Sequence, residues 1–595
     1  MCSSDLLRGC SPKQSPVGAR GMQSILKGDD MNSLHALRAG RLSGHGLATL
    51  ILMAGAAPAA IAQTPASCEA LAGMAIPASA IALPTLGGSV LNATVVPAAG
   101  AGAAFVAEHC RVNGRISPLD PSAPNILFRV ALPTHWNQKA LMYGGGGFDG
   151  SIPNVIGNVP AGATDKALPV TRGYAVFGSD SGHQGGARGS LDGSFGLNDE
   201  ALANWGGDAL KKTRDAAVYV IKARYAGPPL KSYFAGGSTG GREALQSIQR
   251  WPQDWDGAIA WYPAWNQASA MLGGQVASLA LSKPGAYPNA NKRLALFQSA
   301  MQTCDGLDGV IDGLVSNQAA CNAAFDPATA MLNASPLRCA NGADTGDSCL
   351  SDAQIAAVRT MNAPARFAFP LARGNKEYPG YNVWGADLGI TSTSPVQPTI
   401  VFLNLGSAQP ANPMPAAAPY ISQQLDGVLK NIITRDLTFN PLSFDPQQKS
   451  EWSLRWRELS RMIDQSPDIA EFAARGGKLL LAHGLQDVLV SARATEDYYE
   501  RLVQMSGSKQ VASFARFYEV AGYGHAISSQ FNATWDSLTA LEQWAEGGLA
   551  PANQVTVDTV GVPGRSRPLC DYPKWVAYKG TGDVNAAASF ACVNP

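Results

Sequence analysis

A serine enclosed by glycines lies where a strand-like stretch gives way to a helical one. Residues 236–240 read "GGSTG", with "KSYFA" before them and "GREALQSIQR" after them. A sharp strand-to-helix turn forces unusual dihedrals on the serine, so its neighbours must be small, and its Oγ is left exposed above the helix N-terminus. We predict that Ser238 is a nucleophile for acyl transfer; an ordinary glycine-rich turn is the alternative.

A serine hydroxyl needs a base, and only His483 and His525 follow Ser238 in the chain. The chain order serine, acid, histidine of α/β-hydrolases predicts Ser238, Asp487 and His525 as a triad, in which Asp487 orients the imidazole. His483 as the base would leave no acid before it at a comparable strand end. We therefore expect His483 in the wall of the substrate pocket, or as a hydrogen-bonded structural residue.

The tetrahedral intermediate of acyl transfer needs N–H donors for its oxyanion. "MYGGGGFDG" places Gly144 to Gly147 after an early strand, and glycine lets the backbone approach a substrate closely. We predict that the donors are the N–H groups of Gly147, with Gly146 as its rival, and of Thr239. A tight turn without a ligand is the alternative.

A second polar motif, "CDGLDGVIDGLV", contains Asp305, Asp308 and Asp312 within eight residues. Carboxylates crowded on one turn repel each other unless a hard cation neutralises them, and the intervening glycines let backbone carbonyls turn inward. We predict a structural Ca²⁺ site with these three aspartates and the carbonyls of Val310 and Leu314. The spacing is not that of an EF-hand, and a solvated acidic turn is the alternative.

Short apolar runs alternate with helical stretches in a way that predicts the scaffold for these residues. The helical stretch "GDALKKTRDAAVYVIKARY" separates the third run from the fourth. Alternating strands and helices predict a mainly parallel sheet covered on both faces, an α/β architecture. The six runs are "NILFRVALP" from Asn125, "KALMYGGGG" from Lys139, "GYAVFGSD" from Gly173, "KSYFAGG" from Lys231, "GAIAWYP" from Gly257 and "GKLLLAHG" from Gly477.

The alternation lapses in the middle of the chain, which predicts a domain inserted after the fifth or sixth strand and lying over the carboxyl ends of the sheet. A chain of 595 residues exceeds what one hydrophobic centre supports. We expect an N-terminal extension and signal peptide over 1–62, hydrolase core over 63–264 and 466–595, and a lid over 265–465.

The N-terminus is typical of a secretory signal. Arg38 and Arg41 precede an apolar run that is shorter than a membrane span, with small residues up to Ala62, so we expect cleavage near Ala62 and a secreted or periplasmic protein without a membrane span. Lys plus Arg equal Asp plus Glu at 45 each. Neither nucleic acid nor an anionic membrane is implied as a partner, and a small molecule is favoured.

Loss of the signal would leave eight of the ten cysteines, an even number in an oxidising compartment. No C-x-x-C pair exists, so disulfides are favoured over zinc. Spacing suggests pairs in sequence order but does not fix the connectivity. The eight are Cys68, Cys110, Cys304, Cys321, Cys339, Cys349, Cys570 and Cys592.

Together these motifs resemble the tannase and feruloyl esterase family, which includes hydrolases of mono(2-hydroxyethyl) terephthalate. The matching stretches are "GGGGF", "GGSTGGREAL", "CDGLDGVIDG", "HGLQDVLV", "GYGHA" and the closing "RSRPLCDYPKWVAYKGTGDVNAAASFAC". The resemblance implies an α/β-hydrolase fold with a large inserted lid, structural calcium in the lid and hydrolysis of aromatic esters. It also implies the disulfides Cys68–Cys110, Cys304–Cys321, Cys339–Cys349 and Cys570–Cys592.

The chain departs from the family pattern beside the predicted triad. The family typically carries linked cysteines directly before the nucleophile and directly after the histidine, where this chain has Gly237 and Ala526. Packing and hydrogen bonds must therefore hold the triad here.

The lid also differs, because residues 390–429 contain neither Arg nor Lys to bind a substrate carboxylate. This favours a neutral phenolic acyl group. Candidates for stacking on its ring, with core packing as the alternative, are Trp261, Trp265, Trp384 and Phe402.

The sequence thus predicts an exported serine carboxylesterase acting on feruloyl- or galloyl-type esters, with His483, Trp384 and Trp265 lining its pocket. Three alternatives are a mono(2-hydroxyethyl) terephthalate hydrolase, a peptidase and a non-catalytic binding module on a hydrolase fold.

Overall fold

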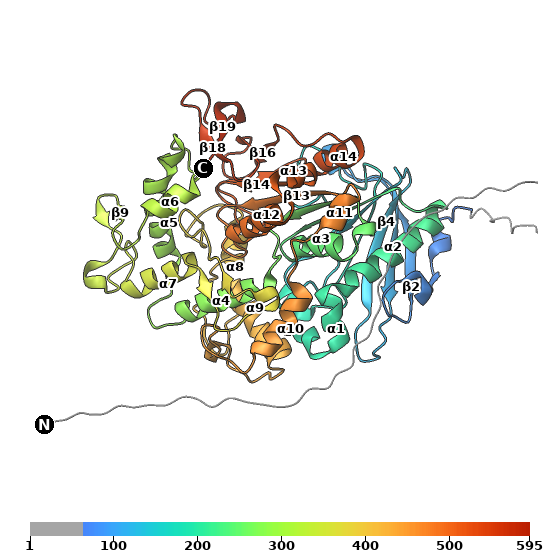
Figure 1. Ribbon diagram of the computed structural model, residues 1–595, viewed down its shortest axis with the longest axis horizontal. Helices are drawn as coiled ribbons and strands as arrows, with labels where there is room; N and C mark the ends of the chain where they lie inside the picture. The colour runs from blue at the N-terminus through green and yellow to red at the C-terminus, as the bar shows by residue number, and fades with distance from the viewer. Residues whose placement is uncertain (1–63) are drawn as a thin grey trace, which may run out of the picture. The chain divides into compact units, whose positions relative to one another are not determined.

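A computed structural model of the chain describes residues 64–595 (Figure 1). The predicted signal peptide and its cleavage site lie outside the described residues. Within residues 64–595, no helix has both the length and the apolar character that a membrane crossing requires.

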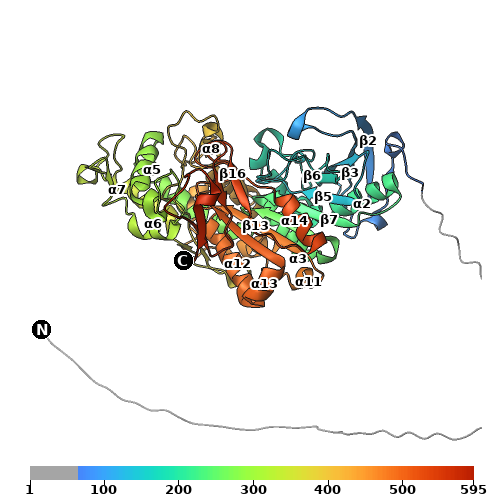
Figure 2. The same cartoon turned by 90° about the horizontal axis from the view of Figure 1, so that it is seen from above.

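A ten-stranded sheet forms the centre of the fold, in the order β1-β2-β3-β4-β6-β5-β7-β8-β13-β14 (Figures 1 and 2). The strands from β6 to β14 in this order are parallel, whereas β1 to β4 pair antiparallel with one another and β4 pairs antiparallel with β6. The bounds are β1 (Ala75–Ile76), β2 (Gly88–Val96), β3 (His109–Ile116), β4 (Ile126–Pro133), β5 (Lys139–Tyr143), β6 (Ala175–Ser179), β7 (Lys231–Gly237), β8 (Gly257–Trp261), β13 (Lys478–Gly484) and β14 (Ala515–Val520).

All six strands expected from apolar runs are confirmed, as β4 to β8 and β13. Their side chains alternate between two apolar layers: Met142 and Leu479 pack in one, Leu141 and Leu480 in the other. Burial on both faces explains why these strands have continuous apolar sequences. The expected parallel arrangement is confirmed from β6 to β14 in the sheet order, whereas the antiparallel strands β1 to β3 were missed. Polar residues such as Arg111 and Arg115 interrupt β3 and point outward.

Helices cover both faces of the sheet and form the inserted segment. Residues of α2, α3, α11, α12 and α13 pack in one of the two layers and those of α14 in the other. The bounds are α1 (Asp199–Ala203), α2 (Ala209–Tyr225), α3 (Thr239–Arg250), α4 (Gln267–Leu281), α5 (Ala290–Cys304), α6 (Gln318–Ala324), α7 (Asp352–Asn362), α8 (Gln397–Leu403), α9 (Tyr420–Val428), α10 (Ser453–Ile463), α11 (Ala470–Ala474), α12 (Ala492–Ser506), α13 (Ser508–Phe514) and α14 (Ser537–Gly547).

The chain between β8 and β13 adds no strand to the central sheet. It forms helices α4 to α11 and two short hairpins (Figure 1). Most of its buried apolar side chains belong to one cluster, which also includes Phe148 and Trp205 from outside the segment. The insertion follows the eighth strand along the chain rather than the fifth or sixth, because the antiparallel strands at the N-terminal edge come first. The remaining short strands are β9 (Met331–Leu332), β10 (Ser335–Pro336), β11 (Ala365–Arg366), β12 (Glu377–Tyr378), β15 (Ala533–Thr534), β16 (Val555–Asp558), β17 (Ser566–Pro568), β18 (Trp575–Tyr578) and β19 (Phe590–Val593).

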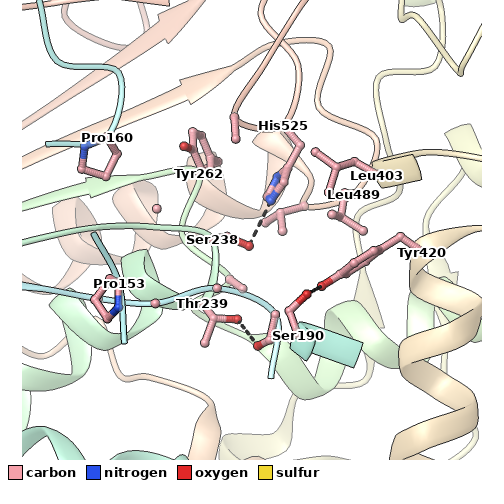
Figure 3. A pocket seen from close by; sticks show the side chains of 18 of the residues that line it. Pro153, Pro160, Ser190, Ser238, Thr239, Tyr262, Leu403, Tyr420, Leu489 and His525 are labelled. Atoms are coloured by element: carbon pink, nitrogen blue, oxygen red, sulfur yellow. Dashed lines mark hydrogen bonds between the residues drawn. The ribbon is translucent and has the colours of Figure 1, made fainter. Parts of the chain in front are cut away.

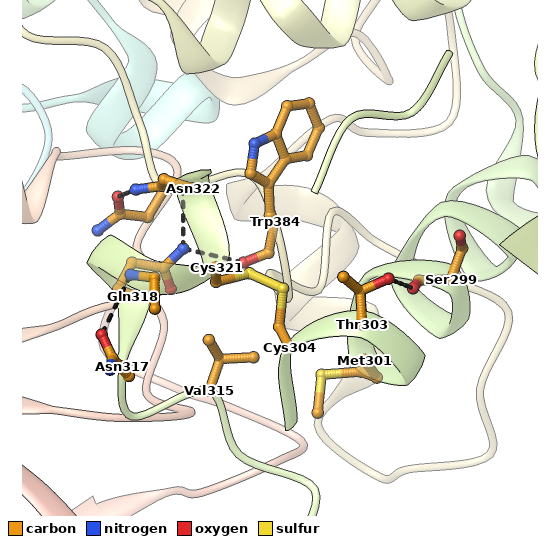
Figure 4. Close-up of a disulfide and its surroundings, with 12 residues drawn as sticks. Ser299, Met301, Thr303, Cys304, Val315, Asn317, Gln318, Cys321, Asn322 and Trp384 are labelled. Carbon is orange, nitrogen blue, oxygen red and sulfur yellow. Dashed lines mark hydrogen bonds between the residues drawn. A yellow bond between two sulfur atoms is a disulfide. The ribbon is translucent and has the colours of Figure 1, made fainter. Parts of the chain in front are cut away.

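Four disulfides join the eight cysteines of the described chain, and they confirm the pairing that the family resemblance implies. The loops closed by these links are short, with sequence separations from 10 to 42 residues. Figure 4 shows Cys304–Cys321, which joins the end of α5 to α6 beside Trp384. The pairs are Cys68–Cys110, Cys304–Cys321, Cys339–Cys349 and Cys570–Cys592.

Candidate active site

Ser238 occupies a strained turn between β7 and α3. Its backbone has φ 60° and ψ −124°, a left-handed conformation that a residue with a side chain rarely adopts. The glycines around it are required by contact: a Cβ on Gly236 would lie 2.1 Å from the Gly240 carbonyl oxygen, and one on Gly240 would lie 2.7 Å from that of Gly145. The turn therefore exposes Ser238 at the carboxyl end of the sheet.

A chain of hydrogen bonds leads from Ser238 into the protein. His525 Nε2 lies 3.0 Å from Ser238 Oγ, and His525 Nδ1 lies 2.7 Å from Asp487 Oδ2 (Figure 3). The other oxygen of Asp487 accepts the N–H groups of Leu489 and Val490, each at 2.9 Å. Asp487 follows β13 and His525 follows β14, so neighbouring parallel strands bring the three predicted residues together.

Asp487 is fully buried, yet its surroundings favour its charged form. Burial alone would raise the pKa of Asp487, but the charge of His525 and hydrogen bonds from His483 and His525 outweigh it and hold that pKa well below its usual range. The carboxylate is thus set to orient an imidazole and to stabilise its cation.

The glycine loop after β5 runs beside Ser238. Gly147 has φ 60°, and Thr239 Oγ1 donates a 2.7 Å hydrogen bond to the Gly147 carbonyl, which fixes this loop against the start of α3. Gly145 N–H is occupied by Glu243 Oε2 at 3.0 Å, whereas the N–H groups of Gly146 and Gly147 meet no acceptor within residues 64–595. Thr239 is the first residue of α3, where N–H groups lack a helical partner.

A cavity of about 650 Å³ opens above Ser238 and His525. The glycine loop lines it, and α8 and α9 of the inserted segment contribute aromatic and aliphatic side chains. No Arg, Lys, Asp or Glu of residues 64–595 lines it. Besides the glycine loop, Ser238 and His525, the lining includes Asn154, Asn158, Ser190, Tyr262, Met271, Phe402, Leu403, Tyr420, Gln424 and Leu489.

The structure does not place His483 in the cavity wall, which corrects that expectation. His483 is fully buried behind Asp487, with Nε2 3.3 Å from Asp487 Oδ2 and 3.0 Å from the Val490 carbonyl oxygen. Its Nδ1 lies 2.8 Å from Thr495 Oγ1. His483 is therefore a hydrogen-bonded structural residue, the second of the two expectations for it.

The tryptophans expected in the pocket belong to the core instead. Trp265 Nε1 donates to the Ala494 carbonyl at 2.6 Å, and its ring packs on Tyr498. Trp384 packs on Phe325 inside the inserted segment. Trp261 is fully buried in the sheet, so only Phe402 of the four stacking candidates lines the cavity. Sequence cannot distinguish these positions, because an indole suits a core and a pocket equally.

The predicted calcium loop is compact and partly neutralised. Asp305 Oδ1 accepts the N–H of Asp312 at 3.0 Å, while Asp312 forms an ion pair with Arg567. Asp308 Oδ2 is buried and has no partner within residues 64–595. Burial, with a smaller contribution from the Asp312 charge, raises the pKa of Asp308 to about 6. Nowhere in this part of the chain do three or more His, Cys, Asp or Glu side chains converge as a metal site would require.

Val310 and Leu314, expected to offer carbonyls, donate their N–H groups to Asp308 Oδ1 at 3.2 Å and Asp312 Oδ1 at 3.0 Å, respectively. The expected role of the two carbonyls as cation ligands therefore stays a prediction, and the contacts that these residues make with the carboxylates come from their N–H groups.

Sequence reasoning missed several residues of the site, among them Ser190, Tyr420 and Tyr262. Ser190 and Tyr420 are 230 positions apart, yet their hydroxyls lie 3.0 Å apart at the cavity wall (Figure 3). Tyr262 follows β8, the strand between those that carry Ser238 and Asp487. No spacing rule connects such positions. The only signal was that Tyr262 ends an apolar strand at the edge where sites form.

Over most of its length the chain is similar to a known protein family and to several known proteins. The family model described as tannase and feruloyl esterase matches residues 110–593. An uncharacterized esterase of Agrobacterium fabrum is 38% identical over 541 residues, covering 89% of this chain and 93% of that protein. The mono(2-hydroxyethyl) terephthalate hydrolase of Piscinibacter sakaiensis is 34% identical, covering 83% and 86% of the two chains.

A solved structure shares the fold. The crystal structure of feruloyl esterase B from Aspergillus oryzae aligns with a TM-score of 0.68 and 21% identity, covering 85% of this chain and 97% of that one. This likeness agrees with the expected α/β-hydrolase fold. Since the family model spans most of the sequence, the chain belongs to the tannase and feruloyl esterase family of carboxylic ester hydrolases.

Proposed function

We propose that this esterase hydrolyses esters of neutral aromatic acids through an acyl-enzyme, with Ser238 as nucleophile, His525 as general base and Asp487 as the residue that orients it. The hydrogen-bond chain from Asp487 to Ser238, which ends in the cavity, carries this proposal. The strained φ of Ser238 supports it, because strain of this kind clusters at functional turns.

In the proposed reaction Ser238 Oγ attacks the ester carbonyl while its proton moves to His525 Nε2. The oxyanion accepts hydrogen bonds from the N–H groups of Thr239 and Gly147, with Gly146 as the alternative to Gly147. As the intermediate collapses, the C–O bond to the alcohol breaks and His525 returns the proton to the leaving oxygen. Water, deprotonated by His525, then attacks the acyl-enzyme and releases the acid and Ser238.

The cavity lining supports a neutral acyl group. Asn154 and Gln424 offer neutral amides that suit phenolic hydroxyls, and the rings of Phe402 and Tyr420 pack edge to face at 5.3 Å. The relative from Piscinibacter sakaiensis carries the name of a terephthalate mono-ester hydrolase. A terephthalate mono-ester brings a free carboxylate, however, and residues 64–595 place no guanidinium or ammonium group in the lining.

A panel of three esters tests this specificity. We expect kcat/KM for methyl ferulate or methyl gallate to exceed that for mono(2-hydroxyethyl) terephthalate by at least about tenfold, corresponding to about 1.4 kcal/mol for leaving the carboxylate unpaired. Initial rates over a range of substrate concentrations give the comparison. A higher kcat/KM for the terephthalate ester would assign the chain to the alternative substrate class.

We also propose that the loop at 305–314 binds one structural Ca²⁺. The buried, unpartnered Oδ2 of Asp308 is the feature that supports it, since an isolated buried carboxylate oxygen is costly. To hold the ion, the side chains of Asp305, Asp308 and Asp312 would have to draw together, since no three such groups converge within residues 64–595, and the carbonyls of Val310 and Leu314 would have to turn toward them. Arg567 forms an ion pair with Asp312, and Arg565, which donates to the Asp312 carbonyl, is itself paired with Asp558. The three carboxylates therefore still offer a cation net negative charge.

Calcium binding should stabilise the folded state. After dialysis against EGTA, adding Ca²⁺ at a hundredfold excess over its Kd should raise the Tm by about 3 °C, because the ligand binds only the folded chain. Asp308→Asn should remove this response. Asp352→Asn, which alters a surface carboxylate paired with Arg338, should retain it. Equal melting of the wild type with and without Ca²⁺, with metal analysis showing that the ion was removed, would contradict the proposal.

We further propose that the protein is exported. Four disulfides within residues 64–595 support an oxidising compartment, as does the signal-like sequence before them.

A further inference from the structure

The space beside Gly237, directly before Ser238, is filled by one side chain. A Cβ built on Gly237 would lie 2.6 Å from Tyr262 Cε2 and 2.8 Å from both Cζ and the hydroxyl oxygen. The phenol ring of Tyr262 therefore lies flush against the backbone of the nucleophile turn. Any side chain at 237 would have to displace this ring.

The backbone holds Tyr262 in place at some cost. Tyr262 has φ 33°, in the left-handed region that aromatic residues rarely occupy. Its N–H donates a 2.7 Å hydrogen bond to the Ala482 carbonyl of β13, which extends the pairing of β8 past its last residue. The side chain is buried, with Trp261 and Tyr523 around it. A conformation this strained persists only where surrounding contacts determine it.

The same ring contacts His525 on its other side. The centroids of the Tyr262 and His525 rings are 4.8 Å apart and their planes are inclined by 57°. Figure 3 shows Tyr262 on one side of the imidazole, with Leu489 and Leu403 on the other. Because β8 lies between β7 and β13 in the sheet, a residue that follows β8 is the one that can touch both the Ser238 turn and the histidine loop.

We propose that Tyr262 is a positioning residue that holds the imidazole of His525 in register with Ser238 Oγ, by filling the volume between the histidine and Gly237. This inference rests on the proposed role of His525 as the general base. The ring limits rotation of the imidazole and keeps Nε2 directed at Ser238. The contact works through shape, since it needs the ring and not the hydroxyl.

The hydroxyl of Tyr262 stays protonated and uncharged in this role. Burial, assisted by the nearby Asp487 charge, raises the pKa of Tyr262 well above its usual range, so the side chain stays neutral at any pH at which the enzyme would work. A neutral ring adds no charge to compete with Asp487 for the imidazolium. This is the physical reason to expect that phenylalanine can replace Tyr262 and alanine cannot.

The experiment compares Tyr262→Ala and Tyr262→Phe in the full chain, with p-nitrophenyl acetate as a small substrate that needs little of the cavity. Tyr262→Ala should lower kcat about 100-fold with KM changed less than about threefold, as expected when a reacting group is misplaced by about 1 Å. Tyr262→Phe should keep kcat within about threefold of wild type.

Tyr498→Ala is the matched control. Tyr498 is a buried tyrosine on α12 that packs on Trp265 outside the cavity, so its truncation reports the general effect of removing such a ring. This variant should lose Tm comparably to Tyr262→Ala but retain the wild-type kcat at a temperature where both are folded. Folding is checked by circular dichroism for each variant.

The inference is overturned if folded Tyr262→Ala retains the wild-type kcat, if its loss appears only in KM, or if Tyr262→Phe loses as much as Tyr262→Ala. Failure of the proposed function looks different: Ser238→Ala would then remain active. An inactive Ser238→Ala together with a fully active Tyr262→Ala would refute the positioning role alone.

Discussion

Ser238→Ala should abolish ester hydrolysis, with kcat falling by a factor of the order of 10⁶, the size typical for loss of a serine nucleophile. The fold should survive, because within residues 64–595 the only side-chain hydrogen bond removed is the one to His525. Alanine keeps the Cβ that the left-handed turn at φ 60° already accommodates. Turnover of methyl ferulate by the purified variant, with its melting curve, provides the measurement.

Ser247→Ala is the control for this experiment. Ser247 lies on α3, the helix that follows Ser238, is fully buried and has an Oγ without a hydrogen-bond partner among residues 64–595. Its replacement should leave kcat unchanged. If Ser238→Ala retained even a tenth of the wild-type kcat, the triad assignment would be wrong.

Asp487→Asn should lower kcat about 10⁴-fold while preserving the structure, and the reason lies in the contacts of the carboxylate. Oδ1 accepts two N–H groups, from Leu489 and Val490, so the amide oxygen of asparagine must take that place. The amide NH₂ then faces His525 Nδ1 and can only donate to it. His525 is driven to carry its proton on Nε2, where it cannot accept the proton of Ser238.

Asparagine matches aspartate in size, so a loss of activity in this variant would report the orientation of the His525 imidazole and not a change in packing. Steady-state kinetics should show the loss in kcat with KM nearly constant. A variant within tenfold of the wild-type kcat would mean that Asp487 does not set the tautomer of His525. The second histidine on this carboxylate, His483, is expected to rearrange with Thr495 rather than to replace His525, because it lies outside the cavity.

The parts of the fold that could be predicted from the sequence are strands that are buried on both faces, because such strands must consist almost entirely of apolar residues. Strands such as β7 and β13 are covered on both faces, so their apolar runs are unbroken and their ends are marked by glycine. Strand β3 was missed because it is covered on one face and carries Arg111 and Arg115 on the other. Strands that are buried on one face only have shorter apolar runs, so they are harder to recognise in a single sequence.

The triad residues of the site could be predicted, because the residue types that the reaction needs follow one another in a known order along the chain. Ser238, Asp487 and His525 were predicted from type and order, and they lie in hydrogen-bond contact. Pocket walls follow no such rule. Trp265 and Trp384 lie in the core, whereas Tyr420 of the inserted segment lines the cavity. Whether an aromatic side chain lies in the core or in the cavity depends on the three-dimensional packing.

The absence of cysteines at 237 and 526 pointed to packing as the support of the triad, but it did not identify the packing residue. Tyr262 is adjacent in sequence to neither position, and its contact with both Gly237 and His525 arises from the order of β7, β8 and β13 in the sheet. Sheet order is a property of the fold and cannot be read from local spacing.

Trapping the acyl-enzyme tests directly whether Ser238 is the nucleophile. The wild-type protein is mixed with methyl ferulate, quenched in acid during turnover, digested and analysed by mass spectrometry. A feruloyl adduct on Ser238 should form within one turnover and disappear as substrate is consumed. Turnover without any adduct on Ser238, or with the acyl group on another residue, would rule out Ser238 as the nucleophile.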